Sequence, residues 1–253
     1  MALETAQVAL DESRNIANVD EYLVGLAIGT RFRANFGVED RLGAMVDEIL
    51  YSEDSYFNAN VFPGVAADVG TRQLINQRNG DSLVLDNSNV VLDVNFGSAK
   101  STFARANAAQ IVDAYKRQIL SGVLRDYKIK QIGRIGLVRK YLFPSKVLAD
   151  TFVDRTVGGT LEGITDINLR FSKRYPADES LVRKGVQDYY NVIFSIIKKP
   201  DRQEIFMSVD YQLCFSPLLP GPEEIAFDDF VSRVMNYNRK SFVTWVQSNY
   251  LKA

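Results

Sequence analysis

The stretch DRQEIFMSVDYQLCF, residues 201–215, contains the single cysteine of the chain and runs into three prolines. Its apolar side chains follow a helical period near 3.6 residues. Pro217, which has no backbone N–H to donate, closes the run. The stretch therefore predicts a helix at the centre of the C-terminal region and indicates an α-helical fold class.

Segments on both sides carry similar helical patterns. Residues 38–58 place one apolar stripe at spacings of three and four residues, which is typical of a helix with one buried face. That stripe consists of Leu42, Met45, Val46, Ile49 and Leu50. Further helices are predicted over residues 18–36, 101–124, 125–143, 145–159, 176–199 and 221–252.

Residues 63–98 differ in composition from the rest. They are rich in Gly, Asn, Asp and Ser and contain the short β-branched runs SLVLD and NVVLDV. Such runs, joined through DNSN, indicate a small hairpin, and an extended arm lying on a partner fits equally well. We therefore expect a mainly α protein with a short β or extended insertion at residues 63–98. An N-terminal helical segment at 1–62 precedes it, and a main helical region at 99–253 follows.

A loose internal echo links residues 17–32 with residues 109–124. Both segments contain the pattern V-D-x-Y followed by apolar residues. The echo fits a duplicated helical unit, and it also fits two amphipathic helices that share a pattern by chance.

The absence of histidine limits the possible functions most. All 253 residues include no His, so the commonest general base and the commonest transition-metal ligand are missing. One cysteine excludes an internal disulfide framework and Cys-based zinc sites. We therefore expect a protein that is not an enzyme and that holds no metal. No apolar run is long enough to cross a bilayer, and the N-terminus lacks the features of a secretory signal.

Residues 125–140 carry a local excess of positive charge. The net charge of the chain is −1, so this excess is not part of a basic protein. The stretch predicts a surface that binds phosphate groups or an acidic protein, and a solvated helix face is the alternative. The candidate partner-binding residues are Arg125, Lys128, Lys130, Arg134, Arg139 and Lys140.

Cys214 has two remaining interpretations once histidine is excluded as its activator. It is either a buried apolar residue or the thioether anchor of a prosthetic group. Asp210 lies four residues earlier, on the same face of the predicted helix, where a carboxylate can accept hydrogen bonds from the ring N–H groups of a linear tetrapyrrole. Lys198, Lys199 and Arg202 would pair with its propionates.

Two stretches resemble phycobilisome linker polypeptides, most closely the gamma-type rod linkers of red-algal phycoerythrin. They are GVEDRLGAMVDEILYSEDSYFNANVF, residues 37–62, and EEIAFDDFVSRVMNYNRKSFVTWVQSNYL, residues 223–251. The scarcity of His and the abundance of Tyr and Arg, which are enriched at protein interfaces, agree with this resemblance.

The resemblance implies a non-enzymatic linker in a light-harvesting antenna. Such a linker assembles rings of phycobiliprotein alpha and beta subunits, contacts other linkers and tunes energy transfer. It implies a place in the chloroplast, in the phycobilisome on the stromal face of the thylakoid membrane. It also implies that Cys214 carries one bilin, phycoerythrobilin or phycourobilin. Gamma-type members have several such cysteines and many rod linkers are basic, whereas this chain has one cysteine and a pI near 5.7.

A different class of function remains open. A nucleic-acid-binding helical protein of the nucleocapsid kind would use the basic stretch at residues 125–140. The balanced charge of the whole chain favours an acidic protein over nucleic acid as the partner.

Overall fold

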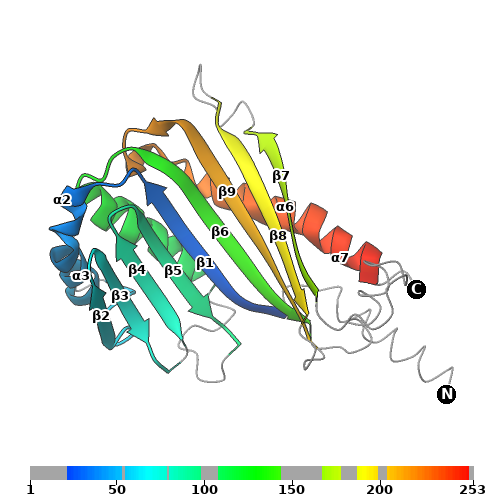
Figure 1. Ribbon diagram of the computed structural model, residues 1–253, viewed down its shortest axis with the longest axis horizontal. Coiled ribbons are helices and arrows are strands. Elements are labelled where there is room, and N and C mark those ends of the chain that lie inside the picture. Colours follow the sequence, from blue (N-terminus) through cyan, green and yellow to red (C-terminus); the bar gives the residue numbers. More distant parts are fainter. Residues whose placement is uncertain are drawn as a thin grey trace.

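The computed structural model describes residues 22–52, 55–78, 80–97, 108–143, 167–177, 187–198 and 204–250. These residues form a nine-stranded antiparallel sheet with helices that lie behind it in the view of Figure 1. The predicted mainly α fold is therefore wrong.

Strand β9, Ile205–Leu219, shows why the helical prediction fails. Every second side chain from Ile205 to Phe215 is buried. The side chains between them, from Phe206 to Cys214, are less buried, with the exception of Gln212. A period of two is the signature of a strand with one face against a core, because successive side chains of a strand point to opposite faces. The same alternation runs along β6, Ile132–Phe143, where a helix was also predicted.

The remaining elements follow in chain order. The other strands are β1 Leu23–Phe32, β2 Gly64–Asp68, β3 Thr71–Asn76, β4 Asp81–Asp86, β5 Asn89–Asn95, β7 Ile167–Pro176 and β8 Tyr189–Lys198. The helical elements are α2 Phe36–Glu39, α3 Leu42–Tyr51, α4 Ala108–Ala114, the π-helical η3 Tyr115–Leu124, the 3-10 turn η4 Pro222–Glu224, α6 Phe227–Tyr237, the π-helical η5 Asn238–Phe242 and α7 Val243–Tyr250. The order of the strands across the sheet is β2-β3-β4-β5-β1-β6-β9-β8-β7.

The sequence-based element predictions are confirmed in some places and wrong in others. Helix α3 buries the whole predicted stripe, and helical elements also occur within 101–124 and 221–252. Strands replace the helices predicted over 18–36, 125–143, 176–199 and 201–215. The helix predicted over 145–159 lies outside the described residues.

Residues 63–98 contribute four strands to the sheet. The predicted hairpin is present as β4 and β5, which pair in antiparallel register. β5 in turn pairs with β1, and β1 pairs with β6. Segments from the three predicted domains therefore share one sheet.

The two halves of the described chain have related topologies. In the first half, β1 is followed by α2 and α3, then by the four-stranded meander β2–β5, whose last strand pairs with β1, and then by the helix α4–η3. In the second half, β6 is followed by the meander β7–β9, whose last strand pairs with β6, and then by α6–α7. The echo between residues 17–32 and 109–124 does not mark this relation, because the first segment contains β1 and the second lies in α4–η3.

The helices attach to one face of the sheet through buried hydrogen bonds. In the first half, the Tyr115 hydroxyl at the start of η3 contacts Thr30 Oγ1 at 3.1 Å and Val90 O at 3.0 Å. In the second half, Asn238 Oδ1 at the start of η5 accepts from the hydroxyls of Tyr141 and Tyr211, each at 3.1 Å. The opposite face of these strands is the one turned towards the viewer in Figure 1.

Candidate functional site

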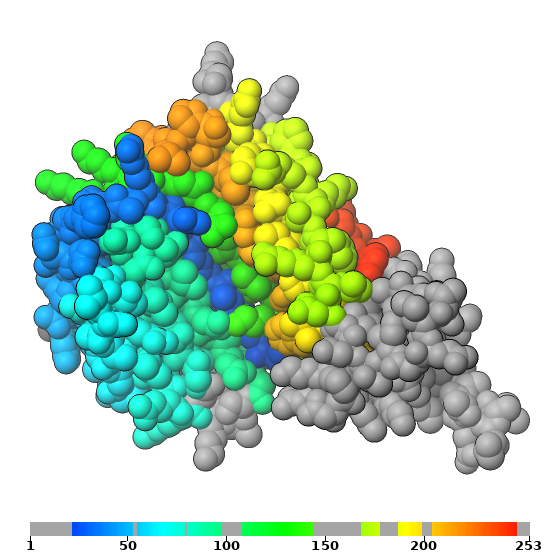
Figure 2. All heavy atoms as spheres, in the orientation of Figure 1, coloured from blue at the N-terminus to red at the C-terminus, as the bar shows by residue number. Residues whose placement is uncertain are grey.

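The helix-free face is hollow where the two halves meet. Gly25, Ala27 and Gly29 of β1 point to this face, and Gly136 of β6 lies directly opposite Gly29. A cavity of about 120 Å³ opens over this pair. Figure 2 looks onto this face and shows the blue atoms of β1 set back between those of the neighbouring strands. The small residues therefore leave a depression at the centre of this face.

Close packing from the adjacent strand restricts position 29. A Cβ at Gly29 would lie 3.0 Å from Val91 Cγ2 and 3.3 Å from the Val90 carbonyl oxygen. At Gly136 the nearest atoms to a Cβ are 3.5 Å and 3.6 Å away, in ordinary contact. The floor of the hollow is therefore backbone, which a ligand group can approach closely.

Two arginines stand side by side at one end of the hollow. Arg31 of β1 is the direct cross-strand partner of Arg134 of β6, and both line the cavity. Like charges directly opposite each other destabilise a sheet. The Arg31 side chain makes no hydrogen bond or ion pair with another described residue, whereas Arg134 lies close enough to Asp210 for its charge to favour ionisation of that carboxyl.

A chain of amide and carboxylate groups continues from Arg134. Its Nη1 donates to Gln212 Oε1 at 3.3 Å, and Asn191 Nδ2 donates to the same oxygen at 3.1 Å. Gln212 Nε2 then donates to Asp210 Oδ2 at 2.5 Å. The network fixes the orientation of the Gln212 amide and places one carboxylate beside the arginines.

Burial raises the pKa of the Asp210 carboxyl, because desolvation disfavours the charged form. The hydrogen bond from Gln212 and the charges of Arg134 and Arg170 act in the opposite direction without cancelling the effect. Ionisation of the Asp210 carboxyl is therefore disfavoured, although it lies within a cationic surface.

Cys214 lies on the same face, next to the arginines. In the sheet register it pairs with Arg134 on one side and with Tyr189 on the other. Burial raises the pKa of its thiol, although a hydrogen bond with Tyr189 lowers it in part. The Arg174 guanidinium stacks 4.4 Å above the Tyr189 ring. A thiol with a raised pKa is a poor nucleophile.

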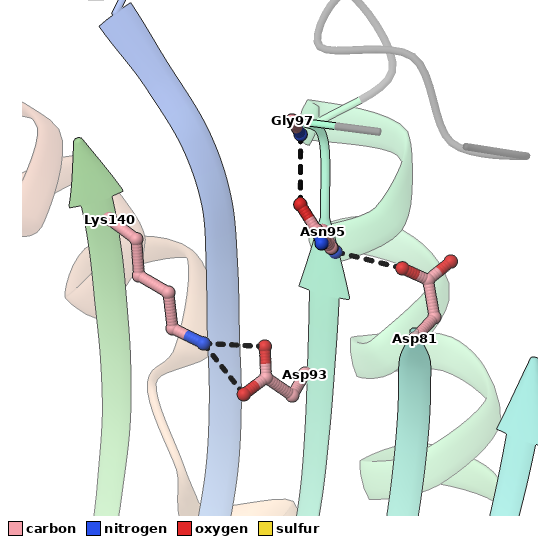
Figure 3. Close-up of polar contacts among 5 residues, drawn as sticks. All are labelled: Asp81, Asp93, Asn95, Gly97 and Lys140. Atoms are coloured by element: carbon pink, nitrogen blue, oxygen red, sulfur yellow. Dashed lines mark hydrogen bonds and ion pairs between the residues drawn. The ribbon is translucent and has the colours of Figure 1, made fainter. Parts of the chain in front are cut away.

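Lys140 is already bound within the protein. Its side chain crosses β1 above Gly25 and places Nζ 2.6 Å from both carboxylate oxygens of Asp93 on β5 (Figure 3). Asn95 lies on the same strand, where its backbone N–H donates to Asp81 at 2.8 Å. This predicted partner-binding residue therefore ties β6 to β5.

The other predicted partner-binding residues do not form one stripe. Arg139 points to the helix-covered face and is only 7% exposed. Arg125 lies at the end of η3 and pairs with Asp126 at 3.0 Å, while Lys128 and Lys130 precede β6. Because β6 is a strand and not a helix, its basic side chains alternate between two faces.

The structure unites Asp210, Cys214 and Arg134, all of which were predicted from the sequence. It adds residues that the helical interpretation missed. The period-two alternation along β9 would have placed Gln212 on the face of Asp210 and Cys214, whereas the residues of the other strands depend on the register between strands. The added residues are Gly29, Arg31, Gly136, Arg174, Tyr189, Asn191 and Gln212. Of the predicted propionate partners, Lys198 is the last residue of β8, at the opposite end of that strand from Tyr189, which pairs with Cys214. Lys199 and Arg202 lie outside the described residues.

A scan against protein-family models, a search of curated proteins and a search of solved structures each found no match to this chain. In the part of the chain that the structure describes, no three His, Cys, Asp or Glu side chains gather into a metal site. The described helices also include none with the length and apolar character needed to cross a membrane.

Proposed function

We propose that this protein is a non-enzymatic binding protein that captures an acidic segment of a partner protein on the helix-free face of its sheet. The observation that supports this proposal most directly is the Arg31–Arg134 pair beside the glycine-floored hollow. A carboxylate placed between two guanidinium groups relieves their repulsion and accepts charge-assisted hydrogen bonds from both.

The shape of the face favours an extended polymer over an enclosed small molecule. The hollow of about 120 Å³ is well below the roughly 300–1,000 Å³ of pockets that bury a small ligand. Arg174 on β7 lies three strands from Arg134, so the cationic groups span a width of about 14 Å at the usual strand spacing. A short acidic peptide segment can contact the whole width.

The mixture of charges favours a peptide over nucleic acid. Asp210 and Asp93 lie among the cations on this face and repel any anion, so a peptide whose acidic residues can be separated by neutral ones fits better than a continuous phosphate backbone. Single-stranded nucleic acid also needs aromatic rings on which bases stack, and the ring of Tyr189 is already covered by Arg174.

The phycobilisome-linker role stays a prediction within this class, with a phycobiliprotein subunit as one partner that presents acidic segments. Its location in the chloroplast and a bilin on Cys214 stay predictions too. The helical architecture on which that role was based is wrong, so the present proposal depends on the chemistry of the sheet face alone.

The test uses a fluorescein-labelled decaglutamate peptide and the full chain, with fluorescence anisotropy as the measurement. Arg134→Gln should weaken binding by about tenfold, since one charge-assisted hydrogen-bonding group is lost. The matched control is Arg125→Gln, which removes the same charge from an exposed site at the end of η3 and should leave binding within about twofold.

Three outcomes would contradict the proposal. Either decaglutamate fails to bind the wild-type chain, or both arginine variants weaken binding equally, which would indicate a general charge effect. If a labelled decauridylate binds more tightly than decaglutamate at the same ionic strength, the partner is nucleic acid.

A further inference from the structure

A second cavity lies on the helix-covered face, between the first turns of α4 and α6. Its volume is about 290 Å³, and Leu26 of β1 and Leu137 of β6 form the apolar part of its floor. Helix α4 begins with Ala108 and Ala109, whose methyl side chains fill little of the space between this helix and α6. The cavity therefore follows from small residues at the start of one helix.

The cavity lies on the seam between the two halves of the fold. Its floor comes from β1 and β6, which pair at the centre of the sheet. Its walls come from the helix that follows the meander in each half, α4 in the first half and α6 in the second. Seams between two packed units and between neighbouring helices are common places for ligand sites.

Most of the cavity is lined by side chains that cannot hydrogen-bond water. Leu26, Leu137 and Phe227 are buried, and Val112 and Val231 are half-buried. A water molecule in a protein interior needs two to four polar partners, whereas a cavity lined by aliphatic and aromatic side chains stays dry and takes up nonpolar molecules. The lining therefore favours an apolar ligand over water.

Charged groups of the two helices at the cavity have partners within the protein. Lys116 Nζ of η3 lies 2.6 Å from Asp228 Oδ2 of α6. Asp113 Oδ2 of α4 accepts a hydrogen bond from Arg117 Nε at 2.8 Å. These pairs are largely exposed, so they add little stability and can open and re-form at low cost when a ligand enters.

Arg139, the remaining charged residue of the lining, is also held by the protein. Its Nε donates to the Tyr141 hydroxyl at 2.8 Å, and its Nη1 lies 3.2 Å from Met235 Sδ. Its guanidinium carbon lies 5.8 Å from the centre of the Tyr141 ring, and the residue makes a further interaction within the protein. An ion that entered the cavity would thus lose its hydration without gaining a counter-ion.

From this lining we infer that the cavity binds a small neutral apolar molecule, of the size of a substituted benzene, between Val112, Phe227 and Val231. The volume lies near the lower limit for small-ligand pockets, which favours a single ring over a long acyl chain. This site is on the opposite face of the sheet from the arginine pair, so the inference is independent of the proposed function.

The test compares toluene with benzoate and benzamidinium as ligands of the full chain by isothermal titration calorimetry. The two ions place a negative or a positive charge on the same ring. Toluene should bind more tightly than either ion by about tenfold or more, because each ion must give up hydration beside charges that are already paired. Benzoate or benzamidinium binding as tightly as toluene would overturn the inference.

Two variants locate the binding site. Val112→Phe fills the cavity from α4 and Val231→Phe fills it from α6, so each should abolish toluene binding. Val65→Phe is the matched control, since it makes the same change at an exposed position of the edge strand β2 and should leave toluene affinity within about twofold.

No toluene binding by the wild-type chain, or wild-type affinity in Val112→Phe or Val231→Phe, would also overturn the inference. If neither variant folds, the comparison of toluene with the two ions in the wild-type chain decides. None of these outcomes bears on the acidic-peptide proposal, whose arginine pair lies on the other face.

Discussion

Arg134 and Arg139 are five residues apart in β6 and point to opposite faces of the sheet. Arg134 lines the hollow on the helix-free face, whereas Arg139 lies under the helices and lines the apolar cavity. An odd separation in a strand always has this effect. These two arginines of one strand therefore have different surroundings, one half-buried on the helix-free face and one nearly buried.

Asp210 provides a pH-dependent test at the residue scale. Burial raises the pKa of this carboxyl in the folded state, so its contribution to stability is present below the unfolded value of about 3.9 and is lost as pH rises through the folded value. The asparagine side chain of Asp210→Asn cannot ionise, so this variant does not lose stability in this way as the pH rises. We expect the variant to have a higher free energy of unfolding than the wild type at pH 7, and a smaller difference at pH 4.

Urea denaturation at the two pH values measures this effect. The amide oxygen of Asn can still accept the hydrogen bond from Gln212, so the packing of the network is kept. A variant that is less stable than the wild type at pH 7 would show that the charges of Arg134 and Arg170 outweigh desolvation.

Strand β1 shows how one element determines both faces of the molecule. Its helix-facing side is large and apolar, with Leu26, Ile28 and Phe32 all buried. Its other face carries few side-chain atoms of its own, because residues 25 and 29 are glycines. The strand thus supports the core on one face and leaves space on the other for the hollow and for the Lys140–Asp93 bridge.

Gly25→Ala tests the narrow side of this strand. An added Cβ would lie 2.7 Å from the Val94 carbonyl oxygen and 3.5 Å from Lys140 Cδ, so the strand or its neighbour must shift. We expect a loss of about 1–3 kcal/mol in the free energy of unfolding. Gly43→Ala in α3 is the control, since no atom lies within 4 Å of the added Cβ.

The control should respond in the opposite direction. In a helix, alanine is favoured over glycine by about 0.5–1 kcal/mol, so Gly43→Ala should stabilise the protein. Thermal or urea unfolding of the two variants distinguishes local space from a general glycine effect. If Gly25→Ala is as stable as the wild type, the close approach of β5 does not exclude a side chain at position 25.

At the scale of the whole molecule, one sheet joins two halves of related topology. β1 and β6 pair at the centre, with Ile28 opposite Leu137 on the helix-covered face and Gly29 opposite Gly136 on the other. Both proposed sites lie at this seam, one on each face. Continuous backbone pairing across the seam should make the two halves unfold together.

Leu83→Ala tests this cooperativity. Leu83 is fully buried in β4, in the first half, whereas the only tryptophan, Trp245, lies in α7 of the second half. Truncation of a buried leucine should lower the free energy of unfolding by about 2–5 kcal/mol. We expect the midpoints from Trp245 fluorescence and from far-UV circular dichroism to fall together. A fluorescence midpoint that stays at the wild-type value would mean that the halves unfold separately.

Local patterns predicted some elements well. The α3 stripe has a clear helical spacing, and the turn residues DNSN lie between two short β-branched runs, so the helix and the β4–β5 hairpin follow from nearest neighbours in sequence. Strands β1, β6, β8 and β9 were predicted as helices. They contain residues such as Leu, Met, Gln and Lys that also favour helices, and tertiary pairing overrides such weak local preferences.

The sequence by itself determined which chemistry is available: no histidine for acid–base catalysis or metal binding, and one cysteine without a disulfide partner. It also placed Asp210 and Cys214 on one face, because a separation of four residues shares a face in a helix and in a strand alike. Only the tertiary structure decided that Arg31 lies beside Arg134. That proximity depends on the register between strands about 100 residues apart, which backbone hydrogen bonds and the buried face establish together.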